Sequence, residues 1–250
     1  MSRGGADGTP VVRIAMWSGP RNISTALLRA WENRPDTVVV DEPFYAYYLT
    51  RVPVDHPGRD EVIAHHETDW RRVVAELLAD LPSGRTIFYQ KHMAHHLLPE
   101  IDRGWLERVT NVFLVRDPRE MIVSLARKMG PPTLRDTGLP QQLEIFRAER
   151  ARTGRTPPVI DAADVLRDPR RALGALCEAL GVPFLDAMLS WPPGRRSTDG
   201  IWAKYWYDAV ERSTGFEPYV PGDRRVPPEL RPLADECMAY YDELREERLR

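Results

Sequence analysis

Short runs of consecutive apolar residues alternate along this chain with longer segments in which apolar residues recur every three or four positions. A continuous apolar run is typical of a strand covered on both faces, and the wider spacing is typical of a helix with one buried side. The segment 69–81 shows the helical spacing, with an apolar stripe through Trp70, Val73, Leu77 and Leu81. We expect strands at 11–17, 37–41, 86–91, 110–115 and 157–161, and helices at 24–33, 69–81, 104–108, 118–129, 140–152, 169–180 and about 228–246.

The alternation of strands with helices predicts an α/β fold with a mostly parallel central sheet flanked by helices. The carboxyl ends of parallel strands meet at one edge of such a sheet, and ligands bind there. Residues that directly follow the strands are therefore the candidates for a functional site.

The loop after the first strand, residues 18–25, reads Ser-Gly-Pro-Arg-Asn-Ile-Ser-Thr and runs directly into a helix. Unpaired N–H groups and the helix dipole favour an anion at such a helix start, and the loop adds a guanidinium and hydroxyls. We expect it to bind a phosphorylated ligand. It differs from an ATPase loop, because Ser24, Thr25 and Ala26 stand where that loop has Gly-Lys-Ser/Thr.

A second candidate for phosphate binding follows the strand 110–115, where Arg116-Asp117-Pro begins a helix with proline at its first position. Ser124 lies eight residues after Arg116, roughly two turns into that helix. A guanidinium at a strand end and a hydroxyl on the next helix can hold one phosphate together. The alternative is an ion pair of Arg116 with Asp117 or Glu120.

Together these segments resemble the nucleotide-binding segments of the sulfotransferases that use 3′-phosphoadenosine 5′-phosphosulfate (PAPS), in particular the bacterial small-molecule type. The loop 20–25 is similar to the family's 5′-phosphosulfate loop, with Asn22 and Ile23 in place of a small hydroxyl residue and a glycine. The run 113–124 is similar to the 3′-phosphate segment, and 157–184 is similar to the strand, loop and helix that follow it.

The resemblance implies a three-layer P-loop-like fold and an enzyme that transfers a sulfuryl group from PAPS to a hydroxyl or amine of a small molecule. The product nucleotide would be 3′-phosphoadenosine 5′-phosphate (PAP), and no metal would be needed. A homodimer is an open possibility. By resemblance, the 5′ end of the nucleotide would be held by Pro20, Arg21, Asn22, Ile23, Ser24 and Thr25, and its 3′-phosphate by Arg116 and Ser124.

Two residues are candidates for the base that takes the proton of the acceptor. Glu42 follows the second strand within Asp-Glu-Pro-Phe, and some bacterial sulfotransferases are similar in using a glutamate there. His92 follows the third strand within Gln-Lys-His, and the larger cytosolic branch is similar in using a histidine. Glu42 is the closer local match, although imidazole has the more suitable pKa at neutral pH. Arg21 would stabilise the charge of the leaving group.

These residues also have structural interpretations. Glu42 could cap the next turn, and Lys91 could be a solvated strand end. His92, His95 and His96 lack the glutamate of the His-Glu-x-x-His pattern, so a metal site is not expected.

Residues 186–219 combine aromatic side chains, glycine and cations, which suits a lid or a substrate-side segment. Sulfotransferases often close a late basic and aromatic segment over the adenosine and 3′-phosphate. The alternative is a packed aromatic edge of the domain. On the first interpretation, the nucleotide would contact Arg195, Arg196, Trp202 and Lys204.

Composition and net charge limit the partners and the location that we expect for this protein. The formal net charge of −2 offers no general attraction for nucleic acid or an anionic membrane, so neither is an expected partner and an anion site must be built locally. Cys177 and Cys237 are the only cysteines, which argues against a disulfide framework and favours the cytoplasm. Residues 1–10 lack the apolar core of a signal peptide, and we expect a disordered tail before a single domain at 11–250.

Two other functions stay open. One is a P-loop kinase for a nucleotide or small molecule, which the missing Gly-Lys-Ser/Thr opposes. The other is a non-catalytic protein that binds a nucleotide bisphosphate, with which Ile23 in place of a glycine would be compatible.

Overall fold

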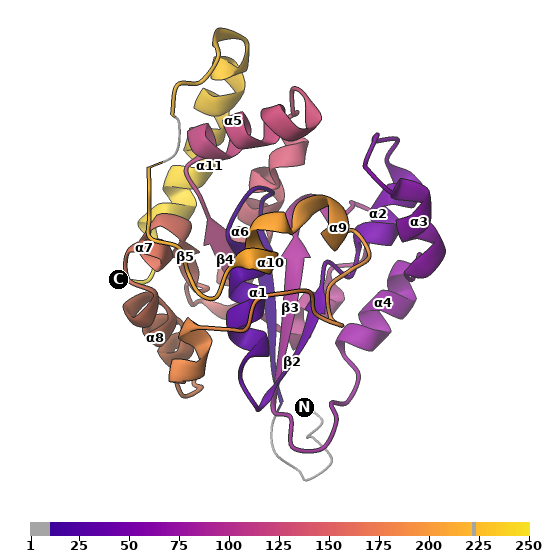
Figure 1. Cartoon of the computed structure of the whole chain (residues 1–250), viewed down its shortest axis with the longest axis vertical. Coiled ribbons are helices and arrows are strands. Elements are labelled where there is room, and N and C mark those ends of the chain that lie inside the picture. The colour runs from indigo at the N-terminus through magenta and orange to yellow at the C-terminus, as the bar shows by residue number, and fades with distance from the viewer. Residues whose placement is uncertain (1–10, 222–223) are drawn as a thin grey trace.

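The computed structural model describes residues 11–221 and 224–250 (Figure 1). The tail expected at residues 1–10 lies outside the described residues. The described strands form a five-stranded sheet in the order β2-β3-β1-β4-β5, and every neighbouring pair is parallel, which confirms the predicted α/β fold. The strands are β1 (Val12–Ser18), β2 (Thr37–Asp41), β3 (Ile87–Met93), β4 (Thr110–Val115) and β5 (Val159–Asp161).

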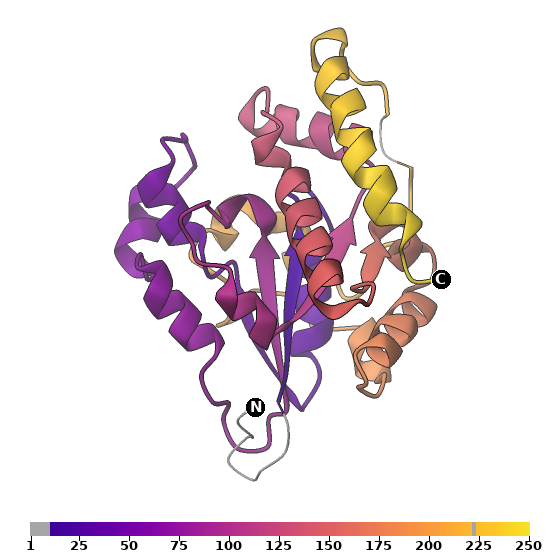
Figure 2. The same cartoon turned by 180° about the vertical axis from the view of Figure 1, so that it is seen from behind.

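The sheet lies between two layers of helices. Side chains of each strand alternate between the two faces of the sheet, so each face can pack against one layer. Ile14 and Met16 of β1 pack into a core with α1 (Ser24–Glu32) and α8 (Pro169–Ala179). Ala15 and Trp17 pack into a second core on the other face. Figure 1 views the sheet from the α1 side, and Figure 2 views it from behind. Helices that contribute to the second core include α2 (Tyr45–Arg51), α4 (Trp70–Leu77), α6 (Leu139–Thr153) and α11 (Arg231–Glu246).

Aspartate caps and prolines begin two helices at the residues that the sequence predicts. The carboxylate of Asp117 accepts from Arg119 N at 3.0 Å, and proline occupies the first turn of α5 (Pro118–Met129). Asp168 caps α8 in the same way. A capping carboxylate satisfies an otherwise unpaired N–H, and proline has no N–H to leave unpaired there.

The structure differs from the hydrophobic pattern mainly in short elements. The helix expected at 69–81 ends at Leu77, and Leu81 packs into the core from the following loop. Segments without a full apolar stripe give little periodic signal, so tertiary packing decides whether they form helices. Helices that the pattern does not predict are α2, α3 (Arg59–His65), α7 (Ala162–Arg167), α9 (Ala203–Trp206) and α10 (Asp208–Arg212). The 3-10 turns are Ala94–His96, Gly104–Arg108 in place of the helix expected at 104–108, Arg135–Thr137, Asp186–Leu189 and Pro228–Leu230.

The topology places a ligand site beside β1. The chain leaves β1 toward β2 and β3 on one side, and later adds β4 and β5 on the other side. Ligands in open parallel sheets bind beyond the carboxyl ends of the strands where the connections reverse in this way. The loop after β1 and Arg116 after β4 both lie at that point.

Cys177 and Cys237 are buried and free, and burial raises the pKa of each thiol to about 11. Within residues 11–221 and 224–250, every helix is too short or too polar to cross a membrane.

Candidate functional site

A cavity of about 550 Å³ opens at the carboxyl edge of the sheet. All residues of the loop 20–25 line it, and so do Arg116 and Ser124. The two segments that the sequence suggests as phosphate sites are far apart in the chain, yet the fold brings them to one cavity.

Direct hydrogen bonds join these two segments. Arg21 Nε donates to Ser124 Oγ at 3.0 Å, and Arg116 Nη1 donates to the Arg21 carbonyl at 2.7 Å. Arg116 also lies 3.3 Å from a carboxylate oxygen of Glu120, so the alternative ion pair exists beside the contact with Arg21. Burial lowers the pKa of Arg21, and the nearby charge of Arg116 lowers it further. Two guanidinium groups that repel each other in this way favour an anion between them.

The start of α1 adds backbone donors to the same cavity. Ser24, Thr25 and Ala26 form its first turn, and Ile23 at the N-cap supplies no side-chain acceptor. The side chain of Ile23 packs against the core beneath α1. Asn22 donates to the carbonyl of Leu114 at 3.2 Å, which ties the loop to β4. First-turn N–H groups beside two guanidinium groups fit a phosphate.

Backbone strain is concentrated in this site. Arg21 (φ 54°) and Glu42 (φ 43°) are the non-glycine residues with positive φ within the described ranges. Such a conformation costs about 1–3 kcal/mol and persists only where surrounding contacts hold it. The Arg21 carbonyl accepts from Arg116, and Glu42 N donates to the Lys91 carbonyl at 2.9 Å. The strained residues are thus held at positions from which both side chains line the cavity.

Glu42 belongs to a buried charge network around Lys91. Lys91 is 1% exposed, and its Nζ lies 2.8 Å from Asp41 Oδ1 and 2.6 Å from Glu42 Oε1. The hydroxyl of Tyr207 accepts from Lys91 at 2.8 Å and donates to Asp41 Oδ2 at 2.6 Å. The three protons of the ammonium therefore all have acceptors. The interpretation of Lys91 as a solvated strand end is wrong, since the residue is enclosed.

Burial and neighbouring charges set the protonation of this network. Burial raises the pKa of Glu42, and Asp41 raises it further, although Lys91 acts in the opposite direction. Burial acts to lower the pKa of Lys91, but Asp41 and Glu42 outweigh this and hold it well above its ordinary value. Lys91 is therefore charged at neutral pH. A carboxylate with a raised pKa is a better general base near neutral pH than a solvated one.

His92 lies in the core rather than at the site that the sequence predicts for it. His92 is 1% exposed, its ring stacks on Trp17 with 4.3 Å between centroids, and it does not line the cavity. It is therefore not placed to take a proton from an acceptor. His95 and His96 do line the cavity. In the part of the chain that the structure describes, no group of three or more His, Cys, Asp or Glu side chains could hold a metal ion.

The buried histidines predict a loss of stability in acid. Burial lowers the pKa of His92 and His95 to about 3 and holds that of His96 well below its usual value. Unfolding restores a pKa of about 6.5, so the unfolded chain binds more protons below that pH and stability falls as the pH decreases, by at most about 1.4 kcal/mol per pH unit for each histidine. Urea unfolding between pH 7.5 and 5 measures this slope.

The variant His92→Phe should make that slope shallower, because it keeps the stacked ring and removes one titrating group. His65→Phe, at an exposed position of α3, is the control and should leave the slope unchanged. Equal slopes for wild type and His92→Phe would contradict the assignment of His92 as a buried neutral imidazole.

The segment 186–219 is attached to α1 and to the end of β2, where Tyr207 donates to Asp41. Arg29 of α1 forms an ion pair with Asp199 at 2.7 Å, and both side chains are 1% exposed. Trp202 is buried and lines the cavity, and its indole N–H donates to the hydroxyl of Tyr207 at 3.3 Å. The segment thus supplies aromatic side chains to the cavity wall.

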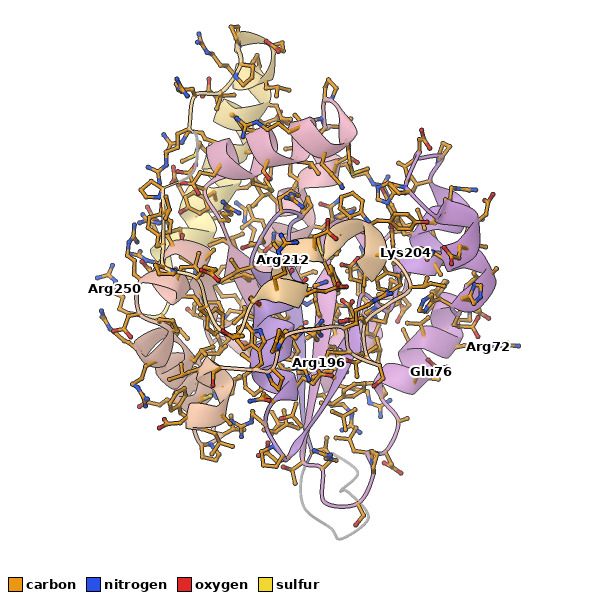
Figure 3. All side chains as sticks on the ribbon, viewed as in Figure 1. Arg72, Glu76, Arg196, Lys204, Arg212 and Arg250 are labelled. Atoms are coloured by element: carbon orange, nitrogen blue, oxygen red, sulfur yellow. The ribbon has the colours of Figure 1, made fainter. Side chains whose placement is uncertain are left out.

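The cations proposed from this segment do not reach the cavity. Arg195 pairs with Glu211 at 3.4 Å, and Arg196 donates to the carbonyl of Pro192 at 2.8 Å. Lys204 pairs with Glu61 of α3. Figure 3 shows Arg196 and Lys204 on the loop and helix that cross in front of the sheet. Trp202 is the one of the four predicted contacts that lines the cavity.

Several lining residues have no counterpart among the sequence-based candidates. Tyr45 and Tyr48 follow Glu42 one helical turn apart on α2, and this closeness to a candidate base is the signal that could have indicated them. The others come from loops and short helices, whose position the sequence pattern does not predict. They include His56, Trp206, Tyr207 and Phe216.

The family model described as "Sulfotransferase domain" matches residues 12–245. The chain belongs to the sulfotransferase-domain family. A sulfotransferase domain from the curacin biosynthetic pathway is similar in structure, with a TM-score of 0.52 and 15% identity over 91% of this chain and 98% of that one. A mouse sulfotransferase solved in complex with PAP gives a TM-score of 0.52 and 13% identity over 94% of this chain and 88% of that one. At these identities the likeness shows the fold alone.

Among curated proteins, the branched-chain-amino-acid aminotransferase-like proteins 1 and 2 of Arabidopsis thaliana are 34% and 32% identical to this chain over 232 residues. The match covers 93% of this sulfotransferase domain but 41% of each plant protein. The chain therefore spans about two fifths of the length of these relatives.

Proposed function

We propose that this protein transfers a sulfuryl group from PAPS to a hydroxyl or amine of a small molecule. The observation that carries the proposal is the contact of Arg21 with Ser124 and Arg116 within one cavity. It supports a nucleotide with a phosphate at each end, because two cationic segments from different strand ends face the same space. The fold of the sulfotransferase-domain family is compatible with this chemistry.

At the donor end, Arg21 and the first turn of α1 would bind the 5′-phosphate, and Arg116 with Ser124 would bind the 3′-phosphate. The bound donor would supply the sulfuryl group. Arg21 would also neutralise charge that develops on the leaving phosphate, as positioned cations do in phosphoryl transfer. Its strained backbone and its contact with Ser124 keep the guanidinium in the cavity.

At the acceptor end, Glu42 would accept the proton of the acceptor. Oε1 is held by Lys91, so the rotation of the carboxylate is restricted. Oε2 lies 4.0 Å from His96 Nδ1, within the lining of the cavity. A fixed carboxylate with a raised pKa is suited to removing a proton as the acceptor oxygen or nitrogen attacks.

Calorimetric titration with PAP tests the donor site. Wild type should bind PAP without Mg²⁺, and Arg116→Gln should weaken binding about 10–100-fold, because it removes a charge-assisted contact of about 1.5–3 kcal/mol. The matched control is Arg72→Gln on α4, whose side chain is 74% exposed and points away from the molecule in Figure 3. Tight Mg²⁺-dependent binding of ATP with no binding of PAP would instead favour a kinase.

A further inference from the structure

The cavity continues past Glu42 into a wall of rings. The rings of Tyr45 and His96 stack with 4.8 Å between centroids, and Trp202 packs edge-on to Tyr45 at 5.0 Å. His56 connects Tyr45 with Trp206, at 5.6 and 5.9 Å. All of these residues line the cavity. We call this set, with Tyr48, the ring cluster: Tyr45, Tyr48, His56, His96, Trp202 and Trp206.

The charges at this end differ from those at the donor end. In the described lining, the lysines and arginines are Arg21 and Arg116 at the donor end and Lys91. Lys91 is fully engaged by its own network and offers no free donor. Among the carboxylates of the lining are Glu42 and Asp55.

His56 and His96 add no positive charge to this wall at neutral pH. Burial lowers the pKa of His56 and of His96, so both imidazoles are neutral. Asp136, which also lines the cavity, accepts from the amide and hydroxyl of Thr133 at 2.8 Å. Lys128 lies on the ring of Trp206 at 5.2 Å from its centroid, but does not line the cavity. An anion placed here would lie beside carboxylates and rings with no free cation among the described lining residues.

We infer that the acceptor is a ring-bearing alcohol that carries no carboxylate or phosphate, with its ring against the ring cluster and its hydroxyl toward Glu42. This inference rests on the proposed function and adds the chemical class of the acceptor. Flat rings pack well against tyrosine, tryptophan and imidazole faces, whereas an unpaired anion in a partly dry cavity pays a desolvation penalty. The donor end holds the anionic nucleotide, and the acceptor end excludes a second anion.

A pair of probes that differ by one carboxylate tests this. Binding of 2-naphthol and of 6-hydroxy-2-naphthoate is measured by calorimetry on the full chain saturated with PAP. We expect 2-naphthol to bind at least about tenfold more tightly. Equal or tighter binding of the carboxylate probe overturns the inference. Failure of PAP itself to bind contradicts the proposed function, so the two failures are distinguishable.

Two variants test whether the ring cluster and its surroundings cause the preference for 2-naphthol over the carboxylate probe. Val54→Arg places a cation in the cavity lining and should reduce the preference for 2-naphthol by at least about fivefold. The control Val220→Arg, at a position that is 77% exposed and outside the lining, should leave the preference unchanged. Trp206→Leu should weaken 2-naphthol about two- to tenfold, and Trp70→Leu on α4, another half-buried tryptophan, should not. A preference that neither Val54→Arg nor Trp206→Leu alters overturns the assignment of the acceptor to the ring cluster.

Discussion

Replacing Glu42 by glutamine is expected to lower kcat for sulfuryl transfer by about 10²–10⁴-fold, because an amide cannot take the acceptor's proton. The affinity for PAP should change little, since Arg21, Arg116 and Ser124 hold the nucleotide in the proposed site. In wild type, kcat should rise with pH through the pKa of Glu42, which burial holds above its ordinary value, and this acidic limb should be lost in Glu42→Gln. Transfer of labelled sulfuryl groups to 2-naphthol, followed across pH, measures both effects.

Two further variants serve as controls for this result. Glu76→Gln removes an exposed carboxylate on α4 (labelled in Figure 3) that is not part of the cavity lining, and should leave kcat unchanged. His92→Phe should also retain most of kcat, because His92 does not line the cavity. A collapse of kcat in His92→Phe together with normal turnover in Glu42→Gln would reassign the base. Tight PAP binding by a wild type that forms no product with any acceptor would favour a nucleotide-bisphosphate sensor.

Replacing Lys91 by methionine is expected to lower the free energy of unfolding by about 3–5 kcal/mol at neutral pH. The substitution leaves the carboxylates of Asp41 and Glu42 enclosed without their counter-ion, and leaves the Tyr207 hydroxyl without one of its donors. The deficit should shrink as the pH falls, because burial raises the pKa of Glu42 and its protonation removes one of the uncompensated charges. Urea unfolding of both proteins between pH 7.5 and 4.5 measures the difference and its pH dependence.

The matched control is Lys204→Met, which breaks the pair of Lys204 with Glu61 on the outside of the molecule. It should change stability little, because solvent screens exposed ion pairs. The double variant Lys91→Met/Asp41→Asn should recover part of the loss of Lys91→Met, since one of the two stranded charges is removed. A loss below about 1 kcal/mol in Lys91→Met at neutral pH would mean that the network is solvated rather than buried.

The prediction for His92 differs from the structure for a specific reason. The apolar pattern ends the third strand at residue 91, which leaves His92 beyond the strand and free to face a site. The strand continues to Met93, so its alternation puts Lys91 and Met93 on the cavity side and turns His92 toward Trp17. Two extra residues of pairing with β1 therefore move the imidazole from the site into the core.

The parallel α/β architecture follows from local sequence signals, and so does the position of the two segments proposed to bind phosphate. Continuous apolar runs, helix stripes and the Asp-Pro start at 117–118 are local signals, and they act over one element. The cavity's charge pattern depends on contacts between distant parts of the chain. Lys91, Asp41 and Tyr207 meet from separate parts of the chain. The ring cluster comes from α2, the loop that follows it, the 3-10 turn after β3 and the segment near Trp202. Burial and long-range pairing, which no local pattern encodes, set the protonation of Glu42 and the chemistry that this end of the cavity can accept.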